Sequence, residues 1–253
     1  MPNKKRAKIS LQGGQSFDVW RSDPVGPAKG GIVVLHAVYG LTDHIGDVCV
    51  KWSDAGYAAV APALYDRHKA NLVHPYSRAG ADAGIESYRA LTEDDIFGFI
   101  KACVISLGEV GGVALSGFCT GGTWCWRACA ALELTAQVNF YGSHVPAFID
   151  LLPRCPTIMH YGDSDTIVPL GDAERIKSKH PNIDVHIYPG AGHAFFNPEQ
   201  ATTNSAAAAL AWQPRLHSWK NMSRRTSRCR AFERSHSVRR VARKMLQRGH
   251  GLV

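Results

Sequence analysis

The sequence predicts an α/β protein: a doubly wound, mostly parallel sheet with helices on both faces, in a single domain. Three observations predict this fold. Short apolar runs rich in β-branched residues recur along the chain, as in strands that are buried on both faces. Segments with helix caps or helical spacing separate these runs at short intervals. A glycine-rich turn over residues 117–122 joins one such run directly to a helical segment.

Each expected strand is short and ends at a turn signal. Residues 8–11 and 17–20 flank the Gly13-Gly14 turn and form the first two strands. Residues 32–36 read Ile-Val-Val-Leu-His, a continuous apolar run that is typical of a parallel strand buried on both faces. The remaining expected strands cover residues 57–61, 113–116, 137–141, 157–161 and 184–188.

Caps and stop signals predict the helices. Thr42 or Asp43 can cap a helix that Gly56 ends, and Thr92 precedes three acidic residues at the start of another. Residues 66–84 are mixed and polar, so we expect a loop with short helices there. Further helices are expected over residues 121–132, 172–179 and 206–213, the last interrupted by Pro214.

The charge is distributed unevenly. The 253 residues carry a formal charge of +8, which by itself would suggest a polyanionic partner. Residues 214–253, however, hold ten Arg, two Lys and one acid, Glu233, a net charge of +11, whereas residues 1–213 hold 17 bases and 20 acids, a net charge of −3. We therefore expect a folded domain over 1–213 with no nucleic-acid partner, and an atypical basic tail over 214–253.

Two interpretations of the tail stay open. Its abrupt change of composition after Gln213 is consistent with a sequence that is out of frame. The alternative is a genuine basic arm, in which Val238, Val241, Met245 and Leu246 could form an amphipathic stripe that contacts a membrane or nucleic acid. Composition favours a disordered or poorly packed tail over such a stripe.

The cysteines and the termini bear on cofactors and location. The chain has seven cysteines, an odd number, and no CxxC pair, so we expect neither a disulfide framework nor a structural metal. No stretch has the length and apolar character of a membrane-spanning helix, and no apolar stretch of signal-peptide type follows the basic N-terminus. We expect a cytoplasmic protein with no cofactor, no metal and no membrane partner.

The glycine-rich turn predicts a nucleophile. Gly117-Phe118-Cys119-Thr120-Gly121 fits the strand-to-helix elbow G-x-S-x-G, with cysteine in the serine position. At a helix N-terminus the dipole favours the thiolate, which is the reactive form of cysteine, and the backbone N–H of Thr120 can stabilise an oxyanion. The alternative is a tight turn that holds an inert cysteine.

A general acid or base and its orienting group are expected after later strands. In enzymes with this elbow the chain order is nucleophile, acid, histidine. Asp163 and Asp165 both follow the strand over residues 157–161; we favour Asp165 as the acid and expect Asp163 to bond local amides. His193 follows the last strand in a small-residue loop. We expect His193 to pair with the Cys119 thiolate and Asp165 to orient the imidazole.

Residues near the end of the first buried strand are expected to complete the pocket. Val38 is expected to supply a second oxyanion N–H. His36 either lines the pocket or is a polar residue at the strand end, and for His44 the second interpretation is favoured.

These residues resemble the dienelactone hydrolases of the α/β-hydrolase superfamily. The resemblance covers residues 8 to 213. It rests on residues 117–122, 141–142, 162–169, 192–195, 39–41, 56–57 and 61–65. It implies hydrolysis of a small ester or lactone, as in a carboxymethylenebutenolidase: Cys119 attacks the carbonyl, an acyl-thioester forms and water hydrolyses it, without a cofactor or metal. It also implies that Tyr39 lies in the substrate pocket.

The sequence departs from this family in two places. The best-studied members carry a carboxylate where Ala37 stands, and they hold a substrate carboxylate with two arginines. Asn197 replaces one of these arginines, and the other is expected at Arg78. The resemblance therefore implies an ester or lactone other than the dienelactone itself, hydrolysed by a monomer or weak homodimer. The competing hypothesis is a hydrolase-fold binding protein with weakened catalysis.

Overall fold

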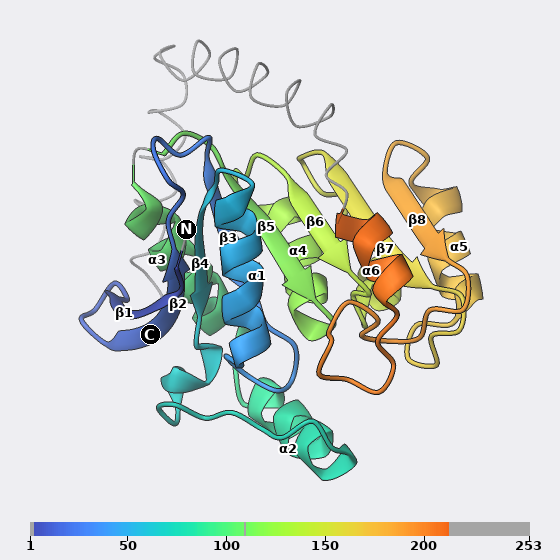
Figure 1. The fold of residues 1–253 in the computed structure, drawn as a ribbon, viewed down its shortest axis with the longest axis horizontal. Coiled ribbons are helices and arrows are strands. Elements are labelled where there is room, and N and C mark those ends of the chain that lie inside the picture. The colour runs from blue at the N-terminus through green and yellow to red at the C-terminus, as the bar shows by residue number, and fades with distance from the viewer. Residues whose placement is uncertain (1–2, 109, 213–253) are drawn as a thin grey trace, which may run out of the picture. The chain divides into compact units, whose positions relative to one another are not determined.

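The computed structural model describes residues 3–108 and 110–212, which form an eight-stranded sheet in the order β1-β2-β4-β3-β5-β6-β7-β8 (Figure 1). β1 (Lys5–Ser10) and β2 (Ser16–Ser22) pair antiparallel, and β2 is antiparallel to β4 (Ala58–Pro62). All later pairings are parallel, which confirms the predicted mostly parallel sheet. The other strands are β3 (Gly31–Leu35), β5 (Val113–Phe118), β6 (Gln137–Phe140), β7 (Thr157–Gly162) and β8 (Asp184–Tyr188).

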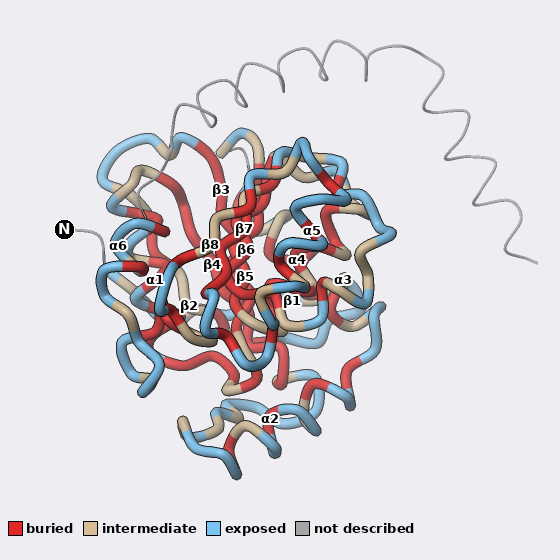
Figure 2. Tube along the Cα trace, turned by 90° about the vertical axis from the view of Figure 1, so that its right-hand side faces the viewer, coloured by how far each residue is buried: buried red, intermediate tan, exposed pale blue. Residues whose placement is uncertain are grey.

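Helices cover both faces of the sheet, as the sequence predicts. Figure 1 shows α1 (Asp43–Asp54) and α6 (Ser205–Trp212) on one face. The opposite face is covered by α3 (Glu93–Leu107), α4 (Thr120–Ala131) and α5 (Leu170–Lys179). In Figure 2 the central strands β3–β6 are coloured as buried. This double winding brings the carboxyl ends of β3 and β5–β8 to one edge of the sheet, where the residues that follow them can meet.

Local signals place the helix ends where expected. Thr92 caps α3 in a complete capping box, in which the Thr92 hydroxyl accepts from Asp95 N–H and the Asp95 carboxylate accepts from Thr92 N–H. Gly56 follows α1 with φ of +95°, a conformation that favours glycine. Thr42 occupies the N-cap position of α1, but its hydroxyl accepts a hydrogen bond from Tyr76 at 3.0 Å instead of capping the helix.

The expected loop over residues 66–84 is wrong in its second half. The structure has a short 3-10 helix, Leu64–Arg67, followed by α2 (Arg78–Arg89), which Ser77 caps. The buried residues of α2 are Gly80, Gly84 and Tyr88, so hydropathy does not reveal its buried face. The backbone of α2 lies close to the loop after β3: a Cβ at Gly84 would be 2.0 Å from the carbonyl oxygen of Val38.

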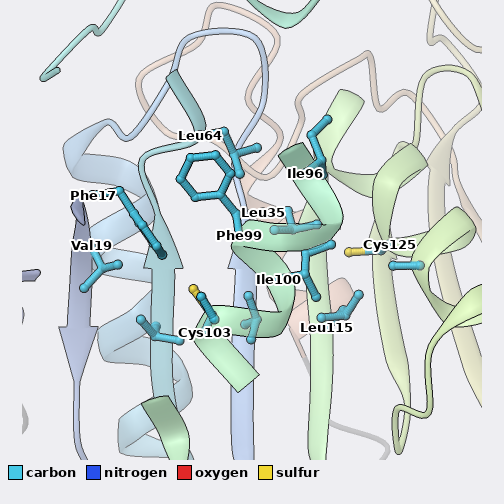
Figure 3. Packing of buried hydrophobic residues seen from close by; sticks show 14 of the residues in the cluster. Phe17, Val19, Leu35, Leu64, Ile96, Phe99, Ile100, Cys103, Leu115 and Cys125 are labelled. Carbon is cyan, nitrogen blue, oxygen red and sulfur yellow. The ribbon is translucent and has the colours of Figure 1, made fainter. Parts of the chain in front are cut away.

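The main core lies between α3 and the strands β2–β5 (Figure 3). Phe17 and Phe99 pack edge to face at its centre with ring centroids 4.6 Å apart. Cys103 and Cys125 are fully buried in this cluster, as expected for cysteines that act as small apolar residues. Burial raises the pKa of both thiols, so neither is a reactive thiolate.

Two further predictions concern the basic tail and membrane-spanning helices. The basic tail over residues 214–253 lies outside the described residues. Within the described ranges, no helix combines the length and the apolar character that crossing a membrane requires.

Candidate active site

The nucleophile turn lies where β5 ends and α4 begins. Cys119 occupies the N-cap of α4 with φ of +54° and ψ of −118°, a strained conformation for a residue with a side chain. A Cβ at Gly117 would lie 2.4 Å from the carbonyl oxygen of Gly121, and a Cβ at Gly121 would lie 2.3 Å from that of Leu35. The glycines are therefore required because strand, turn and helix approach more closely than side chains allow.

Replacing Gly121 by alanine is expected to lower the free energy of unfolding by about 2–4 kcal/mol, because the new methyl group meets rigid backbone. Gly171 in α5 is the matched control, since a Cβ there has no neighbour within 4 Å. Gly171→Ala is expected to be neutral or to stabilise by up to about 1 kcal/mol. Urea denaturation measures both values. Equal stability of Gly121→Ala and wild type would contradict the packing argument.

Asp165 and His193 meet beside this turn. His193 Nδ1 lies 2.8 Å from Asp165 Oδ2 and donates to it, while Asp165 Oδ1 accepts from the backbone N–H groups of Ile167 and Val168 at 2.7 and 2.9 Å. The Asp165 side chain is fully buried, so these three donors hold it in one orientation. His193 Nε2 is buried and has no hydrogen-bond partner of good geometry in the described part of the chain.

Asp163 has a structural role, but its carboxylate does not bond the local amides that the sequence led us to expect. Its Oδ1 accepts from the backbone N–H of Gly190 at 2.7 Å and from the hydroxyl of Ser164 at 2.9 Å. The side chain is exposed and ties the turn after β7 to the loop that carries His193. Asp163 therefore positions the two loops, and Asp165 contacts the histidine.

The electrostatics favour a charged thiolate–imidazolium pair. Burial alone would raise the pKa of the Cys119 thiol, but the positive charge of His193 and the nearby polar groups of His193, Thr120 and Ser143 outweigh burial and lower it. Burial would also lower the pKa of His193, yet the Cys119 charge and the Asp165 hydrogen bond raise it to about 10. Each partner thus stabilises the charged form of the other.

These shifts predict the pH dependence of Cys119 alkylation. Because the pKa of the Cys119 thiol is lowered, the rate with iodoacetamide is expected to rise with pH at an inflection below the usual thiol value of about 8.5. In His193→Gln the Cys119 thiol stays buried but loses the neighbouring positive charge. The inflection of the alkylation rate against pH is therefore expected to move to about pH 8.5 or above. Mass spectrometry of the Cys119 peptide measures the rate. An unchanged inflection would contradict the pairing with His193.

The residues of the two predicted oxyanion donors, Val38 and Thr120, line the same cavity as Cys119. Thr120 is the first residue of α4, so its N–H has no acceptor within the helix. Val38 N–H has no acceptor among residues 3–108 and 110–212. The peptide group that carries Val38 N–H is held through Ala37 O, which accepts from His36 Nδ1 at 2.7 Å and Gly40 N–H at 3.2 Å. The carbonyl oxygen of Val38, in the next peptide group, accepts from the Tyr65 hydroxyl at 2.7 Å. The same hydroxyl donates to Gly84 in α2 at 3.1 Å.

Cys119 and His193 open into a cavity of about 330 Å³ at the carboxyl edge of the sheet. Its wall includes the predicted pocket residue Tyr39 and two residues that sequence analysis missed, Tyr141 and Ser143. The Tyr141 ring packs edge to face on the His193 imidazole with centroids 5.1 Å apart. The residue has φ of +43°, a local strain that no sequence motif reveals.

Two predicted pocket residues lie elsewhere. His36 is fully buried behind the cavity: Nδ1 donates to Ala37 O at 2.7 Å and Nε2 accepts from Leu64 N–H at 3.3 Å, so it joins β3 to the loop after β4. Arg78 is 91% exposed at the start of α2, where it pairs with Asp82 at 3.2 Å. Neither side chain lines the cavity. His44, expected to be structural, does line it.

We also searched the described residues for a metal site and for a second cavity. Among residues 3–108 and 110–212, no group of three His, Cys, Asp or Glu side chains is placed to hold a metal ion. A wider concavity of about 1120 Å³ lies between β1 and α3, but it contains none of the predicted site residues. The cavity at Cys119 is therefore the candidate active site.

The elbow, the strand order and the position of the histidine after the last strand define an α/β-hydrolase. Residues 17–223 match the model of the dienelactone hydrolase family. The chain thus belongs to that family and is a hydrolase of esters or lactones. The match extends past residue 213 and so includes part of the predicted tail.

Individual relatives agree with this assignment. The carboxymethylenebutenolidase of Pseudomonas putida is 26% identical over 223 residues, which cover 82% of this chain and 93% of that protein. A dienelactone hydrolase-like promiscuous phosphotriesterase from metagenomic libraries superposes with a TM-score of 0.70 at 20% identity, over 87% of this chain and 99% of that one. A lidless α/β serine hydrolase of Xanthomonas campestris gives 0.60 at 17% identity, over 86% and 95%.

Proposed function

We propose that this protein hydrolyses a small ester or lactone through Cys119, His193 and Asp165, with an acyl-thioester on Cys119 as intermediate. The observation that carries the proposal is the contact of 2.8 Å between His193 and the buried Asp165, at a strained elbow that presents a cysteine with a lowered pKa. The protein acts on a small-molecule substrate in the cytoplasm and needs no cofactor.

The first half of the reaction forms the intermediate. The Cys119 thiolate attacks the carbonyl carbon and forms a C–S bond, while the carbonyl oxygen becomes an oxyanion facing the N–H groups of Val38 and Thr120. As the intermediate collapses, the C–O bond to the leaving group breaks and the imidazolium of His193 protonates the departing oxygen. An enolate leaves easily, so an enol lactone suits a thiolate nucleophile.

The second half regenerates the enzyme. Neutral His193 now accepts a proton from water, and the resulting hydroxide attacks the thioester carbonyl. The C–S bond breaks, the carboxylic acid product leaves, and the thiolate–imidazolium pair is restored. Asp165 stays ionised throughout and holds the imidazole in the tautomer that keeps Nε2 directed at Cys119.

Stoichiometric alkylation tests the proposal. Wild-type protein is expected to hydrolyse p-nitrophenyl acetate or a methylene-furanone, and one equivalent of iodoacetamide, located on Cys119 by peptide mapping, is expected to abolish turnover. Cys155→Ala provides the control, because Cys155 is a partly exposed free thiol away from the cavity. Full activity after complete alkylation of Cys119, or no hydrolysis of any activated ester or lactone, would overturn the proposal.

A further inference from the structure

Apart from the catalytic pair Cys119 and His193, the cavity has no charged side chain among its described lining residues. None of the described residues that line it is Lys, Arg, Asp or Glu. Three histidines do line it, and His193 belongs to the catalytic pair. His44 is almost fully buried, and burial lowers its pKa to about 4, so it is neutral at physiological pH. His144 is exposed, and its Nδ1 lies 2.9 Å from the Ser143 hydroxyl.

The catalytic residues themselves add negative charge. With Asp165 ionised, the three groups carry one net negative charge whether the proton shared by Cys119 and His193 is on sulfur or on nitrogen. A substrate carboxylate placed in this cavity would lose its hydration, meet no Lys or Arg among the described lining residues, and approach three catalytic groups of net negative charge. The cavity is therefore electrostatically unfavourable for an anion.

The arginines of the neighbouring elements are engaged elsewhere. Arg67 pairs with Asp95 and Arg78 with Asp82, and neither side chain lines the cavity. The two positions at which the family resemblance implies charge hold Ala37 and Asn197, and both line the cavity as neutral residues. Asn197 Oδ1 accepts from Glu199 N–H at 2.9 Å, so this amide is already partly satisfied by the protein.

Apolar groups occupy much of the remaining wall and rim. Val38, Ile45 and Phe118 line the interior and are nearly fully buried. Ile85 of α2 and Ile167 of the loop after β7 line the cavity and are 38% and 57% exposed. Exposed apolar residues around a concave apolar site favour an uncharged ligand with apolar surface.

We infer that the substrate is an uncharged ester or lactone with an apolar acyl part, and that this site selects against substrates that carry a carboxylate. The inference rests on the proposed function of Cys119 and adds the substrate class to it.

A matched pair of substrates tests the inference. We would compare kcat/KM for a methylene-furanone, for the same ring with a carboxylate on its exocyclic carbon, and for the methyl ester of that acid, at about pH 8, where a histidine of ordinary pKa is neutral. Both uncharged lactones are expected to exceed the acid by at least about tenfold. An acid turned over as well as its methyl ester would overturn the inference. No hydrolysis of any of the three would overturn the proposed function itself.

A pair of variants isolates charge from size. Ile85 lies at the partly exposed rim on α2, where a long polar side chain can be accommodated. Ile85→Arg places a cation at the rim, and Ile85→Gln is the neutral polar control. The ratio of kcat/KM for the acid to that for its methyl ester is expected to be at least about fivefold higher in Ile85→Arg than in Ile85→Gln. Equal ratios in the two folded variants would show that charge does not set the preference and would overturn the inference.

Discussion

Cys119→Ala is expected to lower kcat for ester or lactone hydrolysis by at least about ten-thousandfold, the scale of removing a nucleophile from a triad. The variant keeps the cavity and the oxyanion donors but cannot form the C–S bond. The fold is expected to survive, because alanine is smaller than cysteine and the strained backbone at this position is held by neighbouring contacts, such as the hydrogen bond from Cys119 N–H to Phe140 O at 3.0 Å.

Steady-state kinetics with p-nitrophenyl acetate measure the effect, with circular dichroism to verify folding. Cys155→Ala is again the matched control, and its activity is expected to stay within about twofold of wild type, because Cys155 does not line the cavity. A folded Cys119→Ala protein that retains a tenth of wild-type activity would show that Cys119 is not the nucleophile.

Asp165→Asn is expected to lower kcat by about 10³- to 10⁴-fold. Asn can still accept one hydrogen bond, but its NH2 group must then face either His193 Nδ1 or the amides of Ile167 and Val168, which are all donors in the wild type. The imidazole would lose its anionic partner and its preferred tautomer. Asp165 raises the pKa of His193, so its replacement is expected to lower that pKa. The alkaline limb of the pH–rate profile is then expected to move to lower pH.

Asp163→Asn is the matched control for this substitution. Asp163 is exposed and offers one oxygen to Gly190 N–H, and an asparagine carbonyl oxygen can replace it. Its kcat is expected to stay within about threefold of wild type, with at most about 1 kcal/mol lost in stability. A larger loss in Asp163→Asn than in Asp165→Asn would reverse the assignment of the two aspartates.

The sequence is sufficient to predict the parts of the site that depend on chain order and on backbone geometry. The elbow at Cys119 can be recognised in the sequence because the close approach of strand and helix requires glycine at positions 117 and 121. His193 and Asp165 are identifiable because each follows a strand that is itself a clear apolar run. Sheet, helices and core cysteines follow from the same local signals.

Other features depend on contacts that no local pattern encodes. The helix α2 buries two glycines and one tyrosine, and Gly84 approaches Val38 closely, so its buried face is not marked by large apolar residues. The family resemblance implies that Arg78 contacts substrate, and His36 at the strand end could line the pocket. The Arg78 side chain instead turns outward to Asp82, and that of His36 turns inward to Leu64. Tyr141 joins the site through a strained turn beside His193.

Rapid quenching tests the proposed mechanism most directly. Wild-type protein would be mixed with p-nitrophenyl acetate, quenched in acid within the first turnovers and digested for peptide mapping. The mechanism predicts an acetyl group on the peptide that contains Cys119, and its release by neutral hydroxylamine, as expected of a thioester. An active protein with no acyl group on Cys119, or with the acyl group on another residue, would contradict catalysis by this cysteine.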